Sequence, residues 1–365
     1  MLEAGIIGLP NVGKSTLFNA LTKAGALAAN YPFATIEPNV GIVSVPDERL
    51  QQLAEVYQPK KIIPTAYQFT DIAGLVKGAS KGEGLGNQFL SHIREVDAVC
   101  HVVRCFELKD VTHVDGTVDP VRDFETIDVE LRLADLESIE KRLDRLGKKK
   151  KQSPKEGLHE ETLLLKIKET LNSEQRLSYD LFQEEDFPFL KQLQLLSFKK
   201  MLVIANVGEE DLLSLETQQH FQSLKQYLER FSIEVVPVSA QLEAELSSLD
   251  DVEKKEMLMS YGLKQSGLET VIEKSYQLLG LHTFFTAGEP EVRAWTFKKG
   301  MKAPQCAGII HTDFEKGFIR CETLSFDDFL TYRSISKAKD AGKYRLEGKM
   351  YEMHDGDIVH FRFNV

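Results

Sequence analysis

The sequence has few cysteines, no long apolar run and no excess of basic residues, and each absence excludes a class of protein. The four cysteines lack the paired spacing of a zinc site, so buried thiols in a reducing cytosol are expected at Cys100, Cys105, Cys306 and Cys321. No apolar run approaches the roughly 20 residues of a membrane-spanning helix. The first residues form an apolar strand rather than a basic and then apolar leader, so no signal peptide is expected.

The charge of the chain argues against indiscriminate binding to nucleic acid, because the formal net charge is −11. The charge is unevenly spread, however. Residues 283–365 include 13 basic and 12 acidic side chains, and residues 141–155 include eight basic and one acidic. If the protein contacts RNA, these two regions are the expected places. For the lysines at 148–151, a solvated turn is the alternative.

The pattern Gly, four residues, Gly-Lys-Ser occurs at residues 8–15, between an apolar strand at 4–7 and the first turns of a helix at 16–21. Strand, glycine loop and helix together predict a phosphate-binding loop. Backbone N–H groups of the loop and the N-terminus of the helix then bind a polyphosphate. Lys14 is expected to reach the β- and γ-phosphates as the catalytic lysine, and the Ser15 hydroxyl to bind Mg²⁺.

Two further segments carry groups that a bound Mg²⁺–nucleotide needs. Thr35 lies in a proline-punctuated loop and is the candidate for a hydroxyl that reaches the metal when the γ-phosphate is present. Asp71 follows an expected strand at 67–70, where its carboxylate can hold Mg²⁺ through water. Gly74 offers a backbone N–H that can approach the γ-phosphate, because no Cβ is in the way.

Leu75 stands where many GTPases have a glutamine that orients the attacking water. Leucine has no hydrogen-bonding group, so another residue must position the water. The glycines that follow, between 78 and 86, suit a segment that orders when nucleotide binds. A plain flexible surface loop is the alternative.

The expected elements are those of an α/β protein with an insertion and a second, smaller domain. Apolar residues at helical spacing in 127–146 and 164–171 predict an antiparallel helical hairpin. Strands at 201–205 and 233–238 continue the first sheet, and a helix at 267–279 closes it. Further short strands are expected at 294–297, 308–311, 317–320 and 358–363. The expected division is a nucleotide-binding domain at 1–120 and 199–282, the hairpin at 121–198 and a small mixed-sheet domain at 283–365.

GLPNVGKST at 8–16, the loop around Thr35, DIAG at 71–74, NVGE at 206–209 and the pair Ser239-Ala240 together resemble the Obg-related P-loop GTPases. The resemblance is closest to the Obg-like ATPase family, called YchF in bacteria, and covers nearly the whole chain. It implies a P-loop NTPase G domain, an inserted helical hairpin or coiled coil, and a C-terminal domain similar to the TGS fold, a β-grasp module. The nucleotide-binding residues implied are Asn11, Val12, Gly13, Lys14, Ser15, Thr16, Gly74, Asn206, Val207, Glu209, Ser239 and Ala240.

The base-reading motif departs from the Asn-Lys-x-Asp of GTPases, whose aspartate accepts hydrogen bonds from guanine N1 and N2. Here the fourth position holds Glu209, which is one methylene longer, so guanine preference is expected to be weak. The alternative is that Glu209 only caps a following helix. The aspartate that reads guanine would be absent in that case too. The resemblance implies hydrolysis of ATP with weaker GTP binding. It also implies that Asn206 faces the base, with Val207 and the Ser239-Ala240 backbone lining its pocket.

Two residues are candidates for the role of the missing glutamine. Asn11 resembles the asparagine with which potassium-dependent G proteins coordinate K⁺ between the α- and γ-phosphates, where the cation stabilises transition-state charge. His113, in a polar loop, would orient the attacking water as a neutral imidazole. An ordinary exposed histidine is the alternative at this position.

Together these expectations describe a cytoplasmic, monomeric, Mg²⁺-dependent ATPase with slow turnover that acts as a nucleotide-dependent switch in translation or the stress response. Ribosome binding, through ribosomal RNA, is implied by the resemblance and by the two less acidic regions. The alternative is a ribosome- or RNA-binding module in which the nucleotide is regulatory and hydrolysis is incidental. Leu75 favours that alternative.

Overall fold

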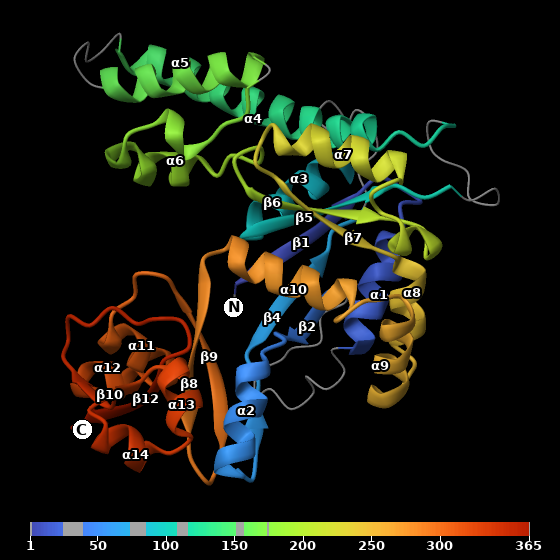
Figure 1. Cartoon of the computed structure of the whole chain (residues 1–365). Helices are drawn as coiled ribbons and strands as arrows, with labels where there is room; N and C mark the ends of the chain where they lie inside the picture. The colour runs from blue at the N-terminus through green and yellow to red at the C-terminus, as the bar shows by residue number, and fades with distance from the viewer. Residues whose placement is uncertain are drawn as a thin grey trace. The chain divides into compact units, whose positions relative to one another are not determined.

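A computed structural model describes residues 2–24, 39–73, 85–107, 116–150, 157–173 and 175–364 (Figure 1). Contacts among the residues divide the chain into two compact units. Of the described residues, the first unit holds those up to Ala24, those at 39–41 and those within 68–271. The second unit holds 42–67 and everything from Ile272 onward. Each unit is built around its own sheet.

The first unit contains the parallel sheet that the sequence predicts. Its order is β2-β4-β1-β5-β6-β7, and β4, β1, β5, β6 and β7 run parallel. The strands are β1 (Glu3–Gly8), β2 (Val40–Ser44), β4 (Ala66–Asp71), β5 (Ala98–Arg104), β6 (Lys200–Asn206) and β7 (Glu234–Val238). All seven residues of β5 are buried, as expected for a central strand covered by helices on both faces. The carboxyl ends of these parallel strands therefore meet at one edge of the sheet.

Helices follow the strands of the first unit and cover its sheet. They are α1 (Lys14–Ala24), α3 (Leu85–Glu95), α7 (Gln219–Glu229), α8 (Ala240–Leu246), α9 (Asp251–Ser260) and α10 (Gly267–Leu278), which continues into the second unit. α1 lies beside α8 (Figure 1), so the helix after the glycine loop contacts the helix after β7. A short 3₁₀ helix at Glu210–Leu213 follows β6.

The inserted hairpin is confirmed and is longer than the sequence predicts. α4 spans Pro120–Lys150 and α5 spans Leu158–Asn172. The two helices run antiparallel, because Arg142 pairs with Glu160 at the tip and Arg132 donates to the carbonyl of Leu171 at the base. Leucines and isoleucines of both helices form one apolar core with the segment that follows, which includes α6 (Phe187–Leu193).

A buried carboxylate ties the hairpin to the chain that returns to the sheet. Asp135 of α4 is 1 % exposed and accepts hydrogen bonds from the backbone N–H groups of Leu196 and Ser197, both at 2.8 Å. The Ser197 hydroxyl donates a third hydrogen bond to Asp135, at 2.7 Å. These bonds satisfy an acid that would otherwise be costly to bury. The hairpin therefore has a fixed attachment point just before β6.

The second unit is built on a mixed sheet in the order β11-β10-β12-β8-β9-β3. Its strands are β3 (Ile62–Ile63), β8 (Leu281–Ala287), β9 (Val292–Lys298), β10 (Phe318–Leu324), β11 (Arg345–Glu347) and β12 (Ile358–Phe363). β12 pairs with β8 and β3 with β9 in parallel, whereas the other pairs are antiparallel. Its helices are α2 (Glu48–Tyr57), α11 (Ala303–Ile310), α12 (Thr312–Lys316), α13 (Phe326–Tyr332) and α14 (Ile335–Asp340).

The strand predicted at 308–311 is wrong, because these residues belong to α11 or end it. Pro304 lies in the first turn of this helix, and the Gln305 side chain accepts a hydrogen bond from the backbone N–H of Lys302, at 2.8 Å. Ala303, Cys306 and Ala307 are buried at helical spacing. A short apolar run such as Gly-Ile-Ile does not distinguish a strand from a buried helix, and the capping residues upstream decide for the helix.

Residues 42–67 group with the C-terminal strands, although the ends of this stretch belong to β2 and β4 of the first sheet and the sequence places all of it in the nucleotide-binding domain. Leu50 and Leu53 of α2 are buried in the same apolar cluster as Phe285 and Phe326. β3 extends the second sheet by pairing with β9. In the sequence this segment lies between two nucleotide-binding motifs, and chain order does not reveal which core a helix joins.

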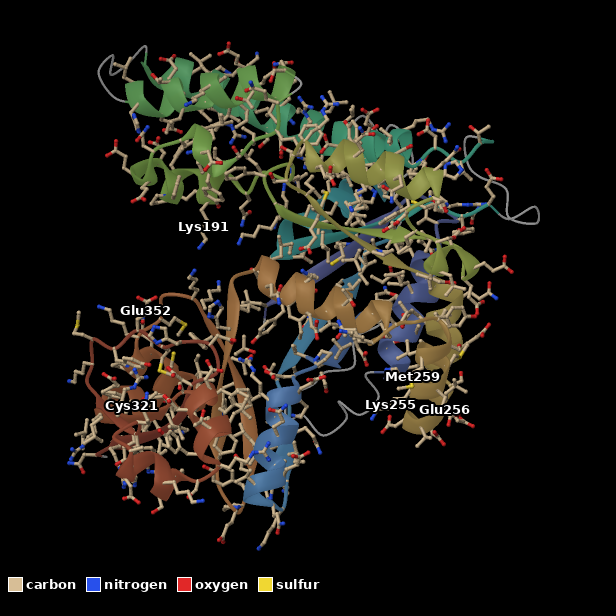
Figure 2. The ribbon with its side chains drawn as sticks, viewed as in Figure 1. Lys191, Lys255, Glu256, Met259, Cys321 and Glu352 are labelled. Carbon is tan, nitrogen blue, oxygen red and sulfur yellow. The ribbon has the colours of Figure 1, made fainter. Side chains whose placement is uncertain are left out.

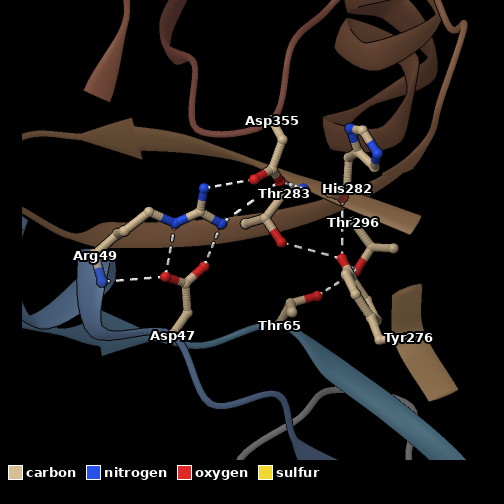
Figure 3. A network of polar contacts seen from close by, with 8 residues as sticks. All are labelled: Asp47, Arg49, Thr65, Tyr276, His282, Thr283, Thr296 and Asp355. Carbon is tan, nitrogen blue, oxygen red and sulfur yellow. Dashed lines mark hydrogen bonds and ion pairs between the residues drawn. The ribbon is translucent and has the colours of Figure 1, made fainter. Parts of the chain in front are cut away.

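Polar contacts hold this segment within the second unit (Figure 3). Asp47 caps α2 and accepts two hydrogen bonds from the Arg49 guanidinium, both at 2.8 Å. The same guanidinium donates to Asp355 at 2.6 Å, and Asp355 also accepts from the backbone N–H of Thr283 at 2.7 Å. Beside them, the hydroxyl of Tyr276 lies within hydrogen-bonding distance of Thr283. Arg49 thus links the start of α2 to the C-terminal strands.

The four cysteines are buried and free, as the sequence predicts; Cys321 is labelled in Figure 2. Burial raises the pKa values of Cys100, Cys306 and Cys321 to about 12, so these thiols stay protonated at neutral pH. Within the described ranges, every helix is too short or too polar to span a lipid bilayer.

Replacing Arg49 with methionine should lower the stability of the second unit by about 1–3 kcal/mol, because Asp47 and Asp355 both lose their charged donor. Thermal unfolding followed by fluorescence measures the change, since the single tryptophan, Trp295, lies in β9. Arg362→Met is the matched control: its ion pair with Glu322 belongs to a side chain that is 54 % exposed, so a change of at most about 1 kcal/mol is expected. Equal losses in the two variants would contradict a special role for Arg49.

Candidate functional site

The glycine loop joins β1 to α1 at the carboxyl edge of the first sheet. Asn11 and Gly13 adopt positive φ angles, 63° and 91°, which turn the loop back over the start of α1. A Cβ at Gly13 would lie 2.2 Å from the side-chain nitrogen of Asn206, so this position accepts only glycine. The first backbone N–H groups of α1 have no partner within the helix and are available to an anion.

The residues around the loop enclose a cavity of about 1800 Å³. All of its lining comes from the first unit and from the segments that follow β1, β4, β5, β6 and β7. The predicted site residues among the lining are Asn11, Gly13, Lys14, Ser15, Thr16, Asp71, Asn206, Val207, Glu209, Ser239 and Ala240. Val12 is buried beneath the loop and is only 1 % exposed. Thr35, Gly74, Leu75 and His113 lie outside the described residues.

Lys14 and Asp71 form an ion pair inside the cavity, with side chains only 11 % and 18 % exposed. The sequence predicts that Lys14 binds a phosphate and that Asp71 binds a cation, so each side chain is expected to pair with a ligand of opposite charge. Ser15, next along α1, also lines the cavity. Among the described residues no cluster of three His, Cys, Asp or Glu side chains could enclose a metal. One carboxylate and one hydroxyl beside a phosphate site suit Mg²⁺, which keeps several waters and phosphate oxygens as ligands.

The side-chain amide of Asn206 braces the cavity. Asn206 ends β6 and is 3 % exposed. Its Nδ2 donates to the carbonyl of Val12 at 2.8 Å, and its Oδ1 accepts from the N–H of Ala240 at 3.0 Å. Both ends of the amide are thereby bonded to backbone, and Asn206 joins the glycine loop to the segment that follows β7. Asn206 also lines the cavity, and the contact with the base stays a prediction.

Glu209 and Val207 lie on the side of the cavity formed by the segments after β6 and β7. The N–H of Val207 donates to the carbonyl of Val238 at 2.9 Å, which fixes the start of the turn. The carboxylate of Glu209 accepts a hydrogen bond from the Tyr261 hydroxyl. Ser239 caps α8 with its side chain, and its neighbour Ala240 begins that helix. These four predicted residues therefore come together from two different strand ends.

Phe106 is a lining residue that the sequence analysis missed. It follows β5, and its carbonyl accepts a hydrogen bond from Arg104 at 3.1 Å. The Arg104 guanidinium also lies 4.5 Å from the centre of the Phe106 ring. The signal was its position just after a buried strand, since that edge of the sheet carries the ligand site. Gln218 and His220, also missed, reach the cavity from the start of α7 and had no sequence signal.

A strand, a glycine loop and a helix at the edge of a parallel sheet, with a lysine and a carboxylate in the cavity beyond, define a P-loop nucleotide hydrolase. In agreement, a family model described as "50S ribosome-binding GTPase" matches residues 3–131. Residues 281–364 match the YchF-GTPase_C family model, described as "Protein of unknown function".

The chain belongs to the YchF family. It is 57% identical over 364 residues to "Ribosome-binding ATPase YchF" of Bacillus subtilis (strain 168), with all of both chains covered. Over 363 residues it is 51% identical to the protein of the same name from Haemophilus ducreyi, covering 100% of this chain and 99% of that one. Among solved structures, the Schizosaccharomyces pombe YchF GTPase matches with a TM-score of 0.90 at 39% identity, covering 99% of this chain and 97% of that chain.

Replacing Asn206 with alanine should weaken nucleotide binding by at least about tenfold, because the Val12 carbonyl and the Ala240 N–H lose their shared partner and the loop loosens. Calorimetric titration with ATP or GTP measures the affinity. Asn172→Ala is the control, since that amide donates to the carbonyl of Lys168 on the exposed surface of the hairpin. Unchanged affinity in Asn206→Ala would show that the brace is dispensable.

Proposed function

We propose that this protein is an Mg²⁺-dependent ATPase that prefers ATP to GTP and works as a slow nucleotide-dependent switch on the ribosome. The observation that carries the base preference is Glu209, which stands at the guanine-reading position and lines the same cavity as Lys14 and Asp71. The relatives' printed name, "Ribosome-binding ATPase YchF", supports both the nucleotide and the partner.

In the proposed reaction a water molecule attacks the γ-phosphate in line with the leaving oxygen. Lys14 leaves its ion pair with Asp71 and binds phosphate oxygens, where its charge stabilises the transition state. Asp71 would then be free to hold the metal together with Ser15 and Thr35. Mg²⁺, when bound, neutralises charge on the β- and γ-phosphates. In the absence of ligand, the ion pair thus compensates two largely buried charges. The phosphates and Mg²⁺ take over this role when they bind together.

The base of the nucleotide is proposed to lie between Phe106 and Val207, which give the cavity an aromatic and an aliphatic wall. Ser239 and Ala240 line the pocket through their backbone, as the family resemblance implies. Glu209 accepts a single hydrogen bond from the adenine amino group, and its extra methylene removes the two-point contact with guanine. GTP binding is weaker for that reason.

The attacking water needs a partner because Leu75 has no hydrogen-bonding group. Asn11 lines the cavity in the glycine loop, where its amide oxygen would help to hold K⁺ beside the phosphates. His113 is the proposed residue that orients the water, and it lies outside the described residues.

Replacing K⁺ with Na⁺ in a hydrolysis assay tests the role of Asn11, and the rate should fall. An unchanged rate would refute the proposal that Asn11 helps to hold K⁺.

The proposed contact with the ribosome uses the less acidic parts of the chain. Residues 141–155, of which 151–155 lie outside the described residues, carry eight basic and one acidic side chain, which suits RNA phosphates. The C-terminal domain, proposed to be TGS-like, is close to neutral. The protein is proposed to act in the cytoplasm as a monomer, in translation or the stress response. We also propose the division into a nucleotide-binding domain, a hairpin and a C-terminal domain, with residues 42–67 and those from Ile272 onward grouped with the C-terminal domain.

A second candidate function is a nucleotide-regulated binding module for the ribosome or RNA, in which hydrolysis is incidental. Leu75 favours it, because a P-loop protein without a water-positioning residue can bind nucleotide without turning it over efficiently. Dependence of the hydrolysis rate on ribosomes separates this module from the switch.

Steady-state hydrolysis of ATP should exceed that of GTP by at least about tenfold in kcat/KM, because only adenine finds a matching partner in Glu209. Phosphate release at fixed Mg²⁺, with each nucleotide in turn, measures the ratio. Ribosomes should raise the ATP rate severalfold if the protein is a switch.

The control is Lys14→Ala, which should abolish hydrolysis of both nucleotides and so exclude a contaminating enzyme. A preference for GTP would refute the proposed base specificity. A rate that ribosomes leave unchanged would instead support the binding module.

A further inference from the structure

Glu209 is held by a residue far away in the chain. The Tyr261 hydroxyl donates a hydrogen bond to Oε1 of the Glu209 carboxylate, although the two residues are 52 positions apart. Glu209 lines the nucleotide cavity together with Val207 and Ala240. Tyr261 does not belong to the described cavity wall, and the residue of that wall to which it donates is Glu209. The hydrogen bond occupies one acceptor position of Oε1 and restrains the orientation of the carboxylate.

The position of the Tyr261 hydroxyl is set by a packed scaffold. Tyr261 is the C-cap residue of α9, and its backbone N–H donates to the carbonyl of Leu258 at 3.2 Å. Its ring packs against an apolar cluster formed by Leu242, Leu246 and Leu258. Leu212, three residues after Glu209, packs against the same cluster. Figure 2 labels Lys255, Glu256 and Met259, which are exposed side chains of this helix. The donor and its acceptor therefore rest on one apolar core.

The hydroxyl remains a donor at physiological pH. Its hydrogen bond to Glu209 raises the pKa of Tyr261 to about 12, with nearby Glu245 and Glu210 acting in the same direction. Asp211, another acid of the cavity wall, accepts a hydrogen bond from the backbone N–H of Gly208 at 3.0 Å and closes the turn. Glu209 is thus the acid at the guanine-reading position, and its orientation depends on a tyrosine.

The two purines make different demands on this carboxylate. Guanine presents the N1–H and N2–H donors side by side, and a two-point contact requires both carboxylate oxygens to face the base. Adenine presents one donor edge at its N6 amino group, beside an N1 acceptor that repels a second oxygen. A carboxylate whose Oε1 is held toward a tyrosine has a restrained orientation, in which Oε2 is the oxygen presented to the base. This orientation matches the single donor of adenine and disfavours the two-point contact with guanine, because that contact requires both oxygens to turn toward the base.

We propose that Tyr261 is a specificity-determining positioning residue, which favours adenine over guanine nucleotides by holding one oxygen of Glu209. This inference rests on the proposed ATPase function and names a further determinant of its base preference. The preference for adenine then depends on the orientation of the Glu209 carboxylate as well as on the extra methylene of the glutamate side chain. A residue outside the cavity wall decides how the base-reading carboxylate is presented.

Tyr261→Phe tests the proposal, because it deletes the hydroxyl and keeps the ring in its apolar cluster. The affinity for GTP should rise about tenfold, as expected when a charged acceptor gains one more donor, and that for ATP should change less than about twofold. Inosine triphosphate, which lacks the N2 amino group, should gain less than GTP. Calorimetric titration of the three nucleotides with Mg²⁺ gives the affinities, and thermal unfolding confirms that the variant is folded.

Two further variants control the test. Tyr227 also donates its hydroxyl to a glutamate, Glu125, at 2.8 Å, but neither residue lines the described cavity, so Tyr227→Phe should leave the ATP to GTP ratio unchanged. In a Glu209→Gln background the ratio should no longer respond to Tyr261→Phe, because an amide cannot accept both guanine donors.

The outcomes separate this inference from the function on which it rests. Wild-type protein that binds neither ATP nor GTP would overturn the proposed function. Wild-type protein that binds ATP, with an ATP to GTP ratio unaffected by Tyr261→Phe, would overturn the role of Tyr261 alone. A shift that persists undiminished in the Glu209→Gln background would also overturn it, because the effect would then not pass through the carboxylate.

Discussion

The two hydrogen bonds of the Asn206 side chain hold together the parts of the chain that make the nucleotide site. One bond reaches the glycine loop after β1 and the other reaches the start of α8 after β7. These segments are about 230 residues apart in sequence at their extremes, and they meet because the strands before them are parallel and end at one edge. A buried amide with both ends satisfied makes their arrangement specific, since leaving either backbone partner unpaired would cost free energy.

The two opposite charges in the cavity pair with each other and can be replaced by a charged ligand. Lys14 and Asp71 neutralise each other in the cavity, and each has a natural partner in a metal–nucleotide complex. The second unit contains the stretch 42–67, which connects the two segments expected to carry metal ligands, Thr35 and Asp71. Arg49 fixes that stretch to Asp355 near the C-terminus. Part of the chain between the two expected metal ligands, α2 and β3, therefore packs with the C-terminal strands.

Much of the fold could be predicted because its signals are local. The apolar strands, the glycine loop and the helical spacing of the hairpin are each visible in a window of a few residues. The strand predicted at 308–311 was wrong because a short apolar run fits a buried helix equally well, and its capping residues lie upstream. Phe106 could be found from the sequence only by its position just after a buried strand, because a single aromatic residue there forms no motif.

The sequence by itself determined the class of protein, the phosphate loop and the departures at Leu75 and Glu209, because these depend on residue type at a fixed spacing. Only the tertiary structure decided which groups those residues touch. It turned the Asn206 amide toward backbone, paired Lys14 with Asp71, packed α2 with the C-terminal strands and brought the Tyr261 hydroxyl to Glu209. The physical reason is that such contacts join residues far apart in the chain, and side-chain direction is set by packing rather than by local spacing.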